Sequence, residues 1–158
     1  SLRDPNPGVR TRAAAALGTI GPSAKEAVPE LIVALRDIEP DVRWQAAAAL
    51  GQVGIAAVPS LIEALRERDP EVRRCVADAL DRLGALARDA VPALASALRD
   101  EDVVVRRSAA SALGRIGEPS ASSVPFLSQA LLDPDMDVRR NAAIALDAVG
   151  QRGRDRSP

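Results

Sequence analysis

The chain has 158 residues, of which 47% are hydrophobic, 27% charged and 1% aromatic. It contains no His or Tyr and only one Cys, one Trp and one Phe, so most side chains used for metal binding, base stacking and proton transfer are missing. The 21 Lys and Arg residues nearly balance the 22 Asp and Glu residues, which argues against recognition of a polyanion by overall charge. The abundance of Leu, Ile and Val favours one folded unit over a disordered chain, and no apolar run predicts a membrane span.

The most informative feature is an internal repeat. The pair Val-Arg recurs at intervals of 33, 30, 33 and 33 residues, with its Val at Val9, Val42, Val72, Val105 and Val138. Each Val is followed by a Leu after eight residues and by a Gly after twelve. A second element begins at the Val-Pro pairs of residues 28–29, 58–59, 91–92 and 124–125. The sequence therefore contains five copies of one unit, the last of them incomplete.

The first unit, near residues 5–37, contains two helical elements. Its first apolar stripe has the spacing of an α-helix, with Asn6 placed to cap the start and Gly21 placed to end it. A second helical stripe runs from Val28 to Leu35, with a Pro in its first turn. The unit is therefore predicted to be a helical hairpin.

The remaining units follow near residues 38–67, 68–100, 101–133 and 134–150. The fifth is a first helix without a partner, and the polar residues 151–158 that follow are expected to be a disordered tail. A hairpin of this size cannot cover its own apolar stripes, so adjacent hairpins must cover them. We expect an all-α fold in which residues 1–150 form a single right-handed α-solenoid of about four and a half stacked helical hairpins.

The repeated unit carries a longer pattern, Asp-Pro-x-Val-Arg-x-x-Ala-Ala-x-Ala-Leu-Gly-x-Ile-Gly, followed by Ala-Val-Pro-x-Leu-x-x-Ala-Leu. The helix start at residues 69–73 and the pairs Ile20-Gly21 and Ile116-Gly117 match it closely. This pattern resembles the HEAT-like repeats of the phycobilisome-lyase type over nearly all of residues 1–150. The matching positions serve packing, capping and turns, so the resemblance implies a fold and leaves the activity open.

The Arg after each repeated Val occupies one position of the unit. These residues are Arg10, Arg43, Arg73, Arg106 and Arg139. The resemblance implies that they form a structural ladder of contacts with Asp residues of adjacent repeats. The alternative is a basic edge that binds phosphates, because a second Arg follows the Arg in the last three units. Interspersed acidic residues and the scarcity of aromatic side chains weigh against that alternative.

A candidate binding surface comes from the second helices. In HEAT-like proteins these helices line the concave surface, so the resemblance places on an inner groove the positions that face away from the apolar stripe. They are Glu30, Val33, Ser60, Glu63, Ala93, Ser96, Phe126 and Gln129. Phe126 is either an exposed anchor for a partner or a residue partly buried against a neighbouring helix. Trp44, on a first helix, is expected either to pack between repeats or to contact a partner.

The function expected is a non-catalytic protein–protein interaction scaffold that binds a protein or peptide along this concave groove. No catalytic residue, metal or cofactor is expected, because the chain lacks His and a glycine-rich phosphate loop. One alternative is a bilin lyase, or an accessory subunit of one, as the phycobilisome-lyase resemblance allows. Another is a nucleic-acid-binding helical repeat. The iron-dependent hydroxylases, also HEAT-like, need His ligands that this chain does not have.

Two further expectations concern the molecule as a whole. Terminal repeats without polar caps favour end-to-end self-association. A cytoplasmic location is expected, with nucleic acid and membranes disfavoured as partners.

Overall fold

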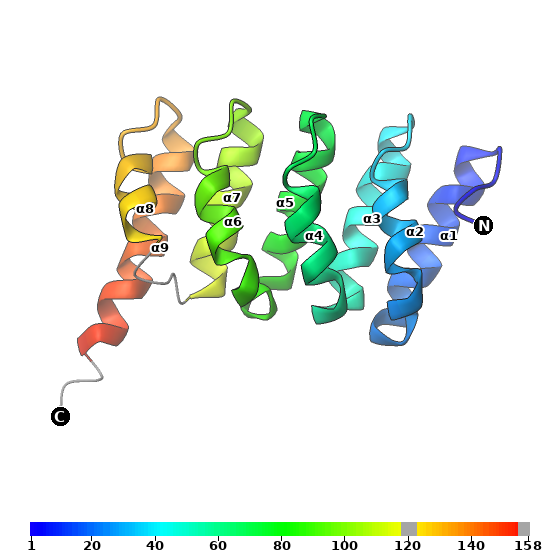
Figure 1. The fold of residues 1–158 in the computed structure, drawn as a ribbon, viewed down its shortest axis with the longest axis horizontal. Helices are drawn as coiled ribbons and strands as arrows, with labels where there is room; N and C mark the ends of the chain where they lie inside the picture. Colours follow the sequence, from blue (N-terminus) through cyan, green and yellow to red (C-terminus); the bar gives the residue numbers. More distant parts are fainter. Residues whose placement is uncertain (118–122, 155–158) are drawn as a thin grey trace.

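A computed structural model shows a row of helical hairpins stacked side by side, with the first and last helices at opposite ends of the row (Figure 1). The structure describes residues 1–117 and 123–154 and has no strand within them. The first helices of the hairpins are α1 (Pro7–Ile20), α3 (Pro40–Val53), α5 (Pro70–Leu83), α7 (Val103–Ile116) and α9 (Met136–Arg154). The second helices are α2 (Val28–Ala34), α4 (Val58–Ala64), α6 (Val91–Ala97) and α8 (Val124–Ala130). The predicted all-α solenoid of stacked hairpins is confirmed.

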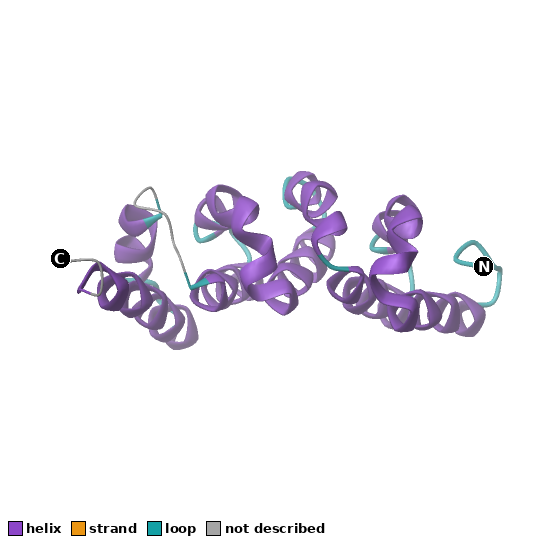
Figure 2. Cartoon of the chain, turned by 90° about the horizontal axis from the view of Figure 1, so that it is seen from below, coloured by secondary structure: helices purple, strands orange, loops and turns teal. Residues whose placement is uncertain are grey.

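The helices form two layers, one of first helices and one of second helices (Figure 2). Each first helix packs against the next first helix along the row, from α1 to α9. Each second helix packs chiefly against the first helix of the following unit, as α2 does against α3. A hairpin therefore depends on its neighbour to cover its second helix, whereas the second helices contact one another only sparsely.

The starts of the first helices follow from their capping residues. The side-chain oxygen of Asn6 accepts the N–H of Gly8 at 2.8 Å, and that of Asp69 accepts the N–H of Glu71 at 2.9 Å. Asp102 Oδ1 accepts two backbone N–H groups at the start of α7. Glu39, the poorer capping residue of the second unit, makes no such bond. The side chain of Glu39 is longer than that of the other capping residues. Pro40 follows at the first position of α3, where it has no N–H group that would need a partner.

The connections within the hairpins are short 3₁₀ turns. They span Gly21–Ala27 in the first unit, Ile55–Ala57 in the second and Gly84–Ala90 in the third. Gly54, which ends α3, has φ +90°, a value that other residues adopt only at a cost in strain. The shorter turn of the second unit accounts for its 30-residue interval, because the helices on both sides keep their lengths.

The last helix ends later than predicted. The backbone of α9 continues through Gly150 to Arg154, so residues 151–154 are helical and the expectation of a disordered tail from residue 151 is wrong for them. A Gly lowers helix stability without requiring the helix to end. Residues 155–158 of the predicted tail lie outside the described residues.

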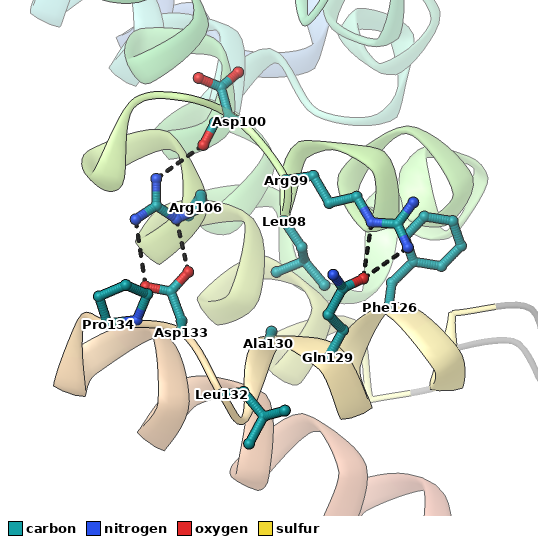
Figure 3. Close-up of a pocket in the computed structure, with 10 residues that line it drawn as sticks. All are labelled: Leu98, Arg99, Asp100, Arg106, Phe126, Gln129, Ala130, Leu132, Asp133 and Pro134. Atoms are coloured by element: carbon teal, nitrogen blue, oxygen red, sulfur yellow. Dashed lines mark hydrogen bonds and ion pairs between the residues drawn. The ribbon is translucent and has the colours of Figure 1, made fainter.

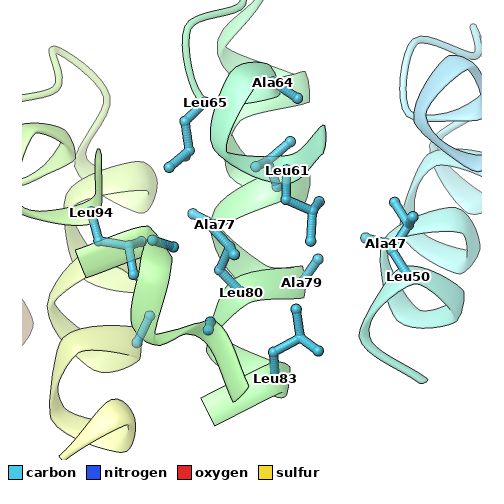
Figure 4. Close-up of a cluster of buried hydrophobic side chains, with 14 of the residues drawn as sticks. Ala47, Leu50, Leu61, Ala64, Leu65, Ala77, Ala79, Leu80, Leu83 and Leu94 are labelled. Carbon is cyan, nitrogen blue, oxygen red and sulfur yellow. The ribbon is translucent and has the colours of Figure 1, made fainter. Parts of the chain in front are cut away.

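The core is a continuous band of small and aliphatic side chains between the layers (Figure 4). Leu50, Leu61, Leu80 and Leu94, from four successive helices, are completely buried. The first helices approach closely, since a Cβ added at Gly18 of α1 would lie 3.1 Å from the Cα of Ala49 on α3. No single helix in the described part of the chain is long and apolar enough to cross a membrane. The bent pair formed by α3 and residues 55–64 meets that test by length and composition.

Candidate partner-binding site

The residues predicted for the groove lie two to a helix on the second layer. They are Glu30 and Val33 on α2, Ser60 and Glu63 on α4, Ala93 and Ser96 on α6, and Phe126 and Gln129 on α8. All of them are at least partly exposed. We call this exposed side of α2, α4, α6 and α8 the second-helix face. The concave shape expected of it stays a prediction.

Three depressions interrupt the second-helix face. One, of about 230 Å³, lies between the N-terminal segment and α2, and another, of about 370 Å³, lies between α4 and α6. A third, of about 520 Å³, lies between α6 and α8. The last two lie where neighbouring second helices contact each other sparsely. Six of the predicted residues line them: Glu30, Val33, Ala93, Ser96, Phe126 and Gln129.

The α6–α8 depression contains an ordered arrangement of an arginine, an aromatic ring and an amide (Figure 3). The Arg99 guanidinium carbon lies 4.6 Å from the centroid of the Phe126 ring. Its Nε and Nη2 donate to Gln129 Oε1 at 3.0 and 2.7 Å. Phe126 is only partly exposed and packs against the core, and its role as an anchor for a partner stays a prediction. Leu132, with 84% of its surface exposed, lies at the rim.

Sequence reasoning missed one set of residues on this face. The Leu that ends each second helix is followed by an Arg in the first three hairpins, and the same pair precedes α1. We call these residues the groove arginines: Arg3, Arg36, Arg66 and Arg99. Each lines one of the three depressions. The repetition of Leu-Arg at the helix ends was the signal that could have identified them.

Arg73 shows the full set of contacts of the arginine ladder. Its Nε and Nη2 donate to Asp100 Oδ2 and Oδ1 at 2.7 and 2.9 Å. Its Nη1 donates to the carbonyl oxygens of Glu67 and Arg68, both at 2.9 Å. Asp100 Oδ1 also accepts the N–H of Asp102 at 2.9 Å. One guanidinium therefore joins the loop before its own helix to the loop before the next first helix.

The other ladder positions repeat this arrangement in whole or in part. Arg10 makes the paired bonds to Asp37, and Arg106 makes them to Asp133. Arg43 and Arg139 donate to their own loop carbonyls, but neither makes the paired carboxylate bonds within the described residues. Arg43 Nη2 instead lies 3.9 Å from Glu71 Oε2 of the next repeat, so the paired carboxylate bonds are present at three of the five positions.

The second arginines of the proposed basic edge also have acidic partners. Arg74 pairs with Asp102 and Arg107 pairs with Asp135, so each joins its helix to the capping residue of the next first helix. The hydrogen bond from Arg74 lowers the pKa of Asp102 to about 2, and the one from Arg107 holds the pKa of Asp135 well below its usual value. The positive charge of this edge is largely matched by carboxylates.

Trp44 lies on the opposite layer from the second-helix face. Trp44 is 56% exposed, and the guanidinium carbon of Arg82 in the next repeat lies 5.2 Å from the centroid of its ring. Arg82 also bonds to Asp78 at 2.8 Å. Trp44 therefore makes an inter-repeat contact and still presents an exposed edge. Among the described residues, no group of three or more His, Cys, Asp or Glu side chains could hold a metal ion.

The profile of HEAT repeats matches residues 1–60, 34–101 and 58–147, which together span most of the chain. The chain belongs to the HEAT-repeat family. A comparison with curated proteins finds no match to this chain. Among solved structures, the complex of CpcE and CpcF of phycocyanin lyase from Nostoc sp. PCC7120 is 29% identical, with a TM-score of 0.73. That alignment covers 95% of this chain and 62% of the lyase chain.

Two other solved structures are similar in fold. A designed armadillo repeat protein in complex with the peptide (KR)4 is 19% identical, has a TM-score of 0.65 and is aligned over 94% of this chain and 78% of its own. Human deoxyhypusine hydroxylase is 32% identical, with a TM-score of 0.62, over 78% of this chain and 43% of its own. This HEAT-repeat chain therefore spans less than two thirds of both the lyase and the hydroxylase.

Proposed function

We propose that this HEAT-repeat chain is a non-catalytic scaffold that binds a protein or peptide along its second-helix face. The observation that carries the proposal is the α6–α8 depression. It has a volume of about 520 Å³, and the guanidinium of Arg99 stacks on the ring of Phe126 in its wall. Aromatic and arginine side chains dominate binding energy at protein interfaces, and a partly buried ring loses little freedom when it is contacted.

The ladder supports this proposal because it fixes adjacent repeats relative to one another. Arg10, Arg73 and Arg106 are joined to carboxylates and carbonyl groups between repeats. These bonds hold successive hairpins at a fixed spacing, and a partner that spans several repeats meets a preorganised surface. The designed armadillo neighbour carries a peptide and the lyase neighbour carries a companion subunit, which is consistent with a protein partner for a stack of this kind.

Site-specific photo-crosslinking tests which face binds. A benzoylphenylalanine replaces Glu63 on α4 in one variant and Thr19 on α1 in a matched control, since both positions are exposed on a helix. In extract of the source cells, we expect a discrete protein adduct from position 63 and none from position 19. The same adduct from position 19 alone would contradict the proposal.

Affinity for the partner identified in this way tests the face further. Phe126→Ala and Glu63→Arg change two second helices without touching the buried leucines. We expect at least one of them to weaken binding by about tenfold, the effect of losing one anchor at an interface. Unchanged binding by both variants would remove the second-helix face as the site.

A bilin lyase, or an accessory subunit of one, is the second candidate, favoured by the 29% identity to the phycocyanin lyase structure. The chain would then act together with a companion chain on a bilin-sized ligand. Adding bilin to the protein and recording the visible spectrum tests this alternative. A shifted absorption band that Phe126→Ala abolishes would favour the lyase over the scaffold.

Nucleic-acid binding receives less support. Arg73, Arg74, Arg106 and Arg107 all pair with carboxylates, so binding phosphates would require breaking these bonds. Tight binding of duplex or single-stranded DNA at physiological salt would overturn the scaffold proposal. A cytoplasmic location stays a prediction.

End-to-end association is a separate proposal that rests on the two ends of the ladder. Among the described residues, Arg139 has no carboxylate partner. The carboxylate of Asp4 accepts a hydrogen bond there only from the N–H of Asn6. Stacking the last repeat of one copy on the first repeat of another would let them pair. Sedimentation velocity should then show association of the 158-residue chain that Arg139→Ala weakens, and a concentration-independent monomer would contradict it.

A further inference from the structure

The groove arginines differ from the ladder arginines in their partners. The ladder residue Arg73 is buried and held by Asp100, whereas all four groove arginines are exposed. The side chains of Arg3 and Arg66 have no ion pair or hydrogen bond within the described residues. Arg36 pairs with Glu67. The second-helix face therefore carries positive charges that the fold itself does not use.

The wall of the α6–α8 depression contains two arginines and two aspartates. The two carboxylates in its wall are engaged, Asp100 by Arg73 and Asp133 by Arg106. Arg99 has only the neutral amide of Gln129 as a hydrogen-bond acceptor. Its positive charge is consequently the one in this wall that no carboxylate neutralises.

Apolar surface surrounds that charge. Leu98, Phe126, Ala130, Leu132 and Pro134 line the same depression, and Figure 3 shows Leu132 and Phe126 on either side of Ala130 and Gln129. The stacking of Arg99 on Phe126 fixes the guanidinium at the edge of this apolar surface. A ligand that suits it needs an apolar group beside a carboxylate, because the guanidinium offers further N–H donors in one plane.

The next groove arginine also stands beside apolar side chains, in a depression whose wall contains two carboxylates, Asp100, which Arg73 engages, and the exposed Asp89. Arg66 lines the adjacent depression between α4 and α6 together with Ile62 and Ala93. Packed helices lie about 8–10 Å apart, and an extended chain advances about 3.3 Å per residue, so it crosses one repeat in about three residues. Acidic side chains spaced about three residues apart would therefore meet Arg99 and Arg66 in turn.

We propose that the partner supplies an extended acidic segment, in which an apolar side chain enters the α6–α8 depression and the neighbouring carboxylates bind Arg99 and Arg66. This inference rests on the proposed function, since it names the chemistry of the partner for the same face. It distinguishes the partner from nucleic acid, which would offer phosphates and no apolar side chain.

Two labelled peptides of about 12 residues test the inference with the full chain, one repeating Leu-Glu-Ser and the other Leu-Lys-Ser. In NMR titrations we expect the acidic peptide to shift the side-chain signals of Arg99 and Phe126, and the basic peptide to leave them unchanged. Fluorescence anisotropy should show about tenfold weaker binding of the acidic peptide by Arg99→Gln. Arg12→Gln, which removes the same charge from an exposed position on α1, is the matched control and should bind like the parent.

Equal binding of both peptides, equal losses in Arg99→Gln and Arg12→Gln, or no shift at Arg99 at millimolar peptide would overturn the inference. Competition of the acidic peptide by a single-stranded oligonucleotide at equal affinity would also overturn it. If position 63 crosslinks a protein while the acidic peptide fails to bind, the proposed function stands and this inference alone fails. If the adduct forms only at position 19, both fail.

Discussion

Arg73 and Arg43 occupy the same position in adjacent repeats but have different partners. Both donate to two carbonyls of the preceding loop, yet only Arg73 also makes paired bonds to a carboxylate, Asp100. At the position that corresponds to Asp100, the second unit has Glu67, which pairs with Arg36 instead. Arg43 has only a longer ion pair, 3.9 Å from Nη2 to Oε2 of the partly exposed Glu71, so the two arginines separate the contribution of the paired carboxylate bonds from that of the carbonyl bonds.

We expect Arg73→Ala to lower the free energy of unfolding by about 3 kcal/mol, because it leaves Asp100 without its cation at a largely buried position. Arg43→Ala should cost about 1 kcal/mol, mainly the loss of its carbonyl bonds, because its 3.9 Å ion pair with the partly exposed Glu71 contributes little. Urea unfolding of the two variants measures the difference. Equal costs would show that the carboxylate adds nothing to the ladder.

The ion pair between Arg74 and Asp102 makes stability depend on pH. Since the pKa of Asp102 is lowered to about 2 in the folded chain, its carboxylate stabilises the fold above about pH 4. This contribution is lost as the pH falls from about 4 through 2, where the folded-state group takes up its proton. Asp102→Asn keeps a capping side chain but removes the charge.

Asp102→Asn should therefore lower the free energy of unfolding by about 1 kcal/mol at pH 7 and by much less at pH 2. Thermal unfolding of parent and variant across this range tests it. A constant difference between them at every pH would contradict the assignment of the lowered pKa to this pair.

At the scale of the helix, the repeated Leu holds each first helix against its neighbours. Leu50 of α3 and Leu113 of α7 are completely buried. Replacing either by Ala should cost about 2 to 5 kcal/mol, because a cavity remains in a core that neighbouring helices can fill only partly. Leu86→Ala is the matched control, since that Leu is 53% exposed and should change stability by less than about 0.5 kcal/mol. A melting shift of Leu50→Ala no larger than that of the control would show that the apolar stripe has been assigned wrongly.

The elements that sequence predicts well are those set by local chemistry. Asn6 and Asp69 cap helices where the pattern places them, and Gly54 ends one with a positive φ. Gly150 led to a wrong prediction of where the last helix ends. A Gly inside a helix only weakens it, and α9 continues past this position. Local rules identify a residue that can end a helix, and the rest of the chain decides whether it does.

The candidate site was predictable in part for a related reason. Helical spacing placed Phe126 and Gln129 on the second layer, and both line the α6–α8 depression. Arg99 lies just after the end of α6, outside the spacing that identified the other positions. Its contacts reach across to α8, and the distance between neighbouring second helices is a property of the stack that sequence spacing within one helix does not define.

At the scale of the whole molecule, stability comes from contacts between neighbours. Each first helix packs on the adjacent first helices, and each second helix packs on the first helix of the following unit. Within the described residues, the main contacts between helices join the same or adjacent repeats, so the surface of the stack grows in proportion to the number of units. This open form leaves the second-helix face free for a partner along the entire row.

Small-angle X-ray scattering on the monomeric chain tests this central claim most directly. A compact domain of 158 residues would have a radius of gyration of about 15 Å. The open stack predicts a value clearly above this and a distance distribution with a long tail. A radius near 15 Å with a symmetric distance distribution would contradict the account.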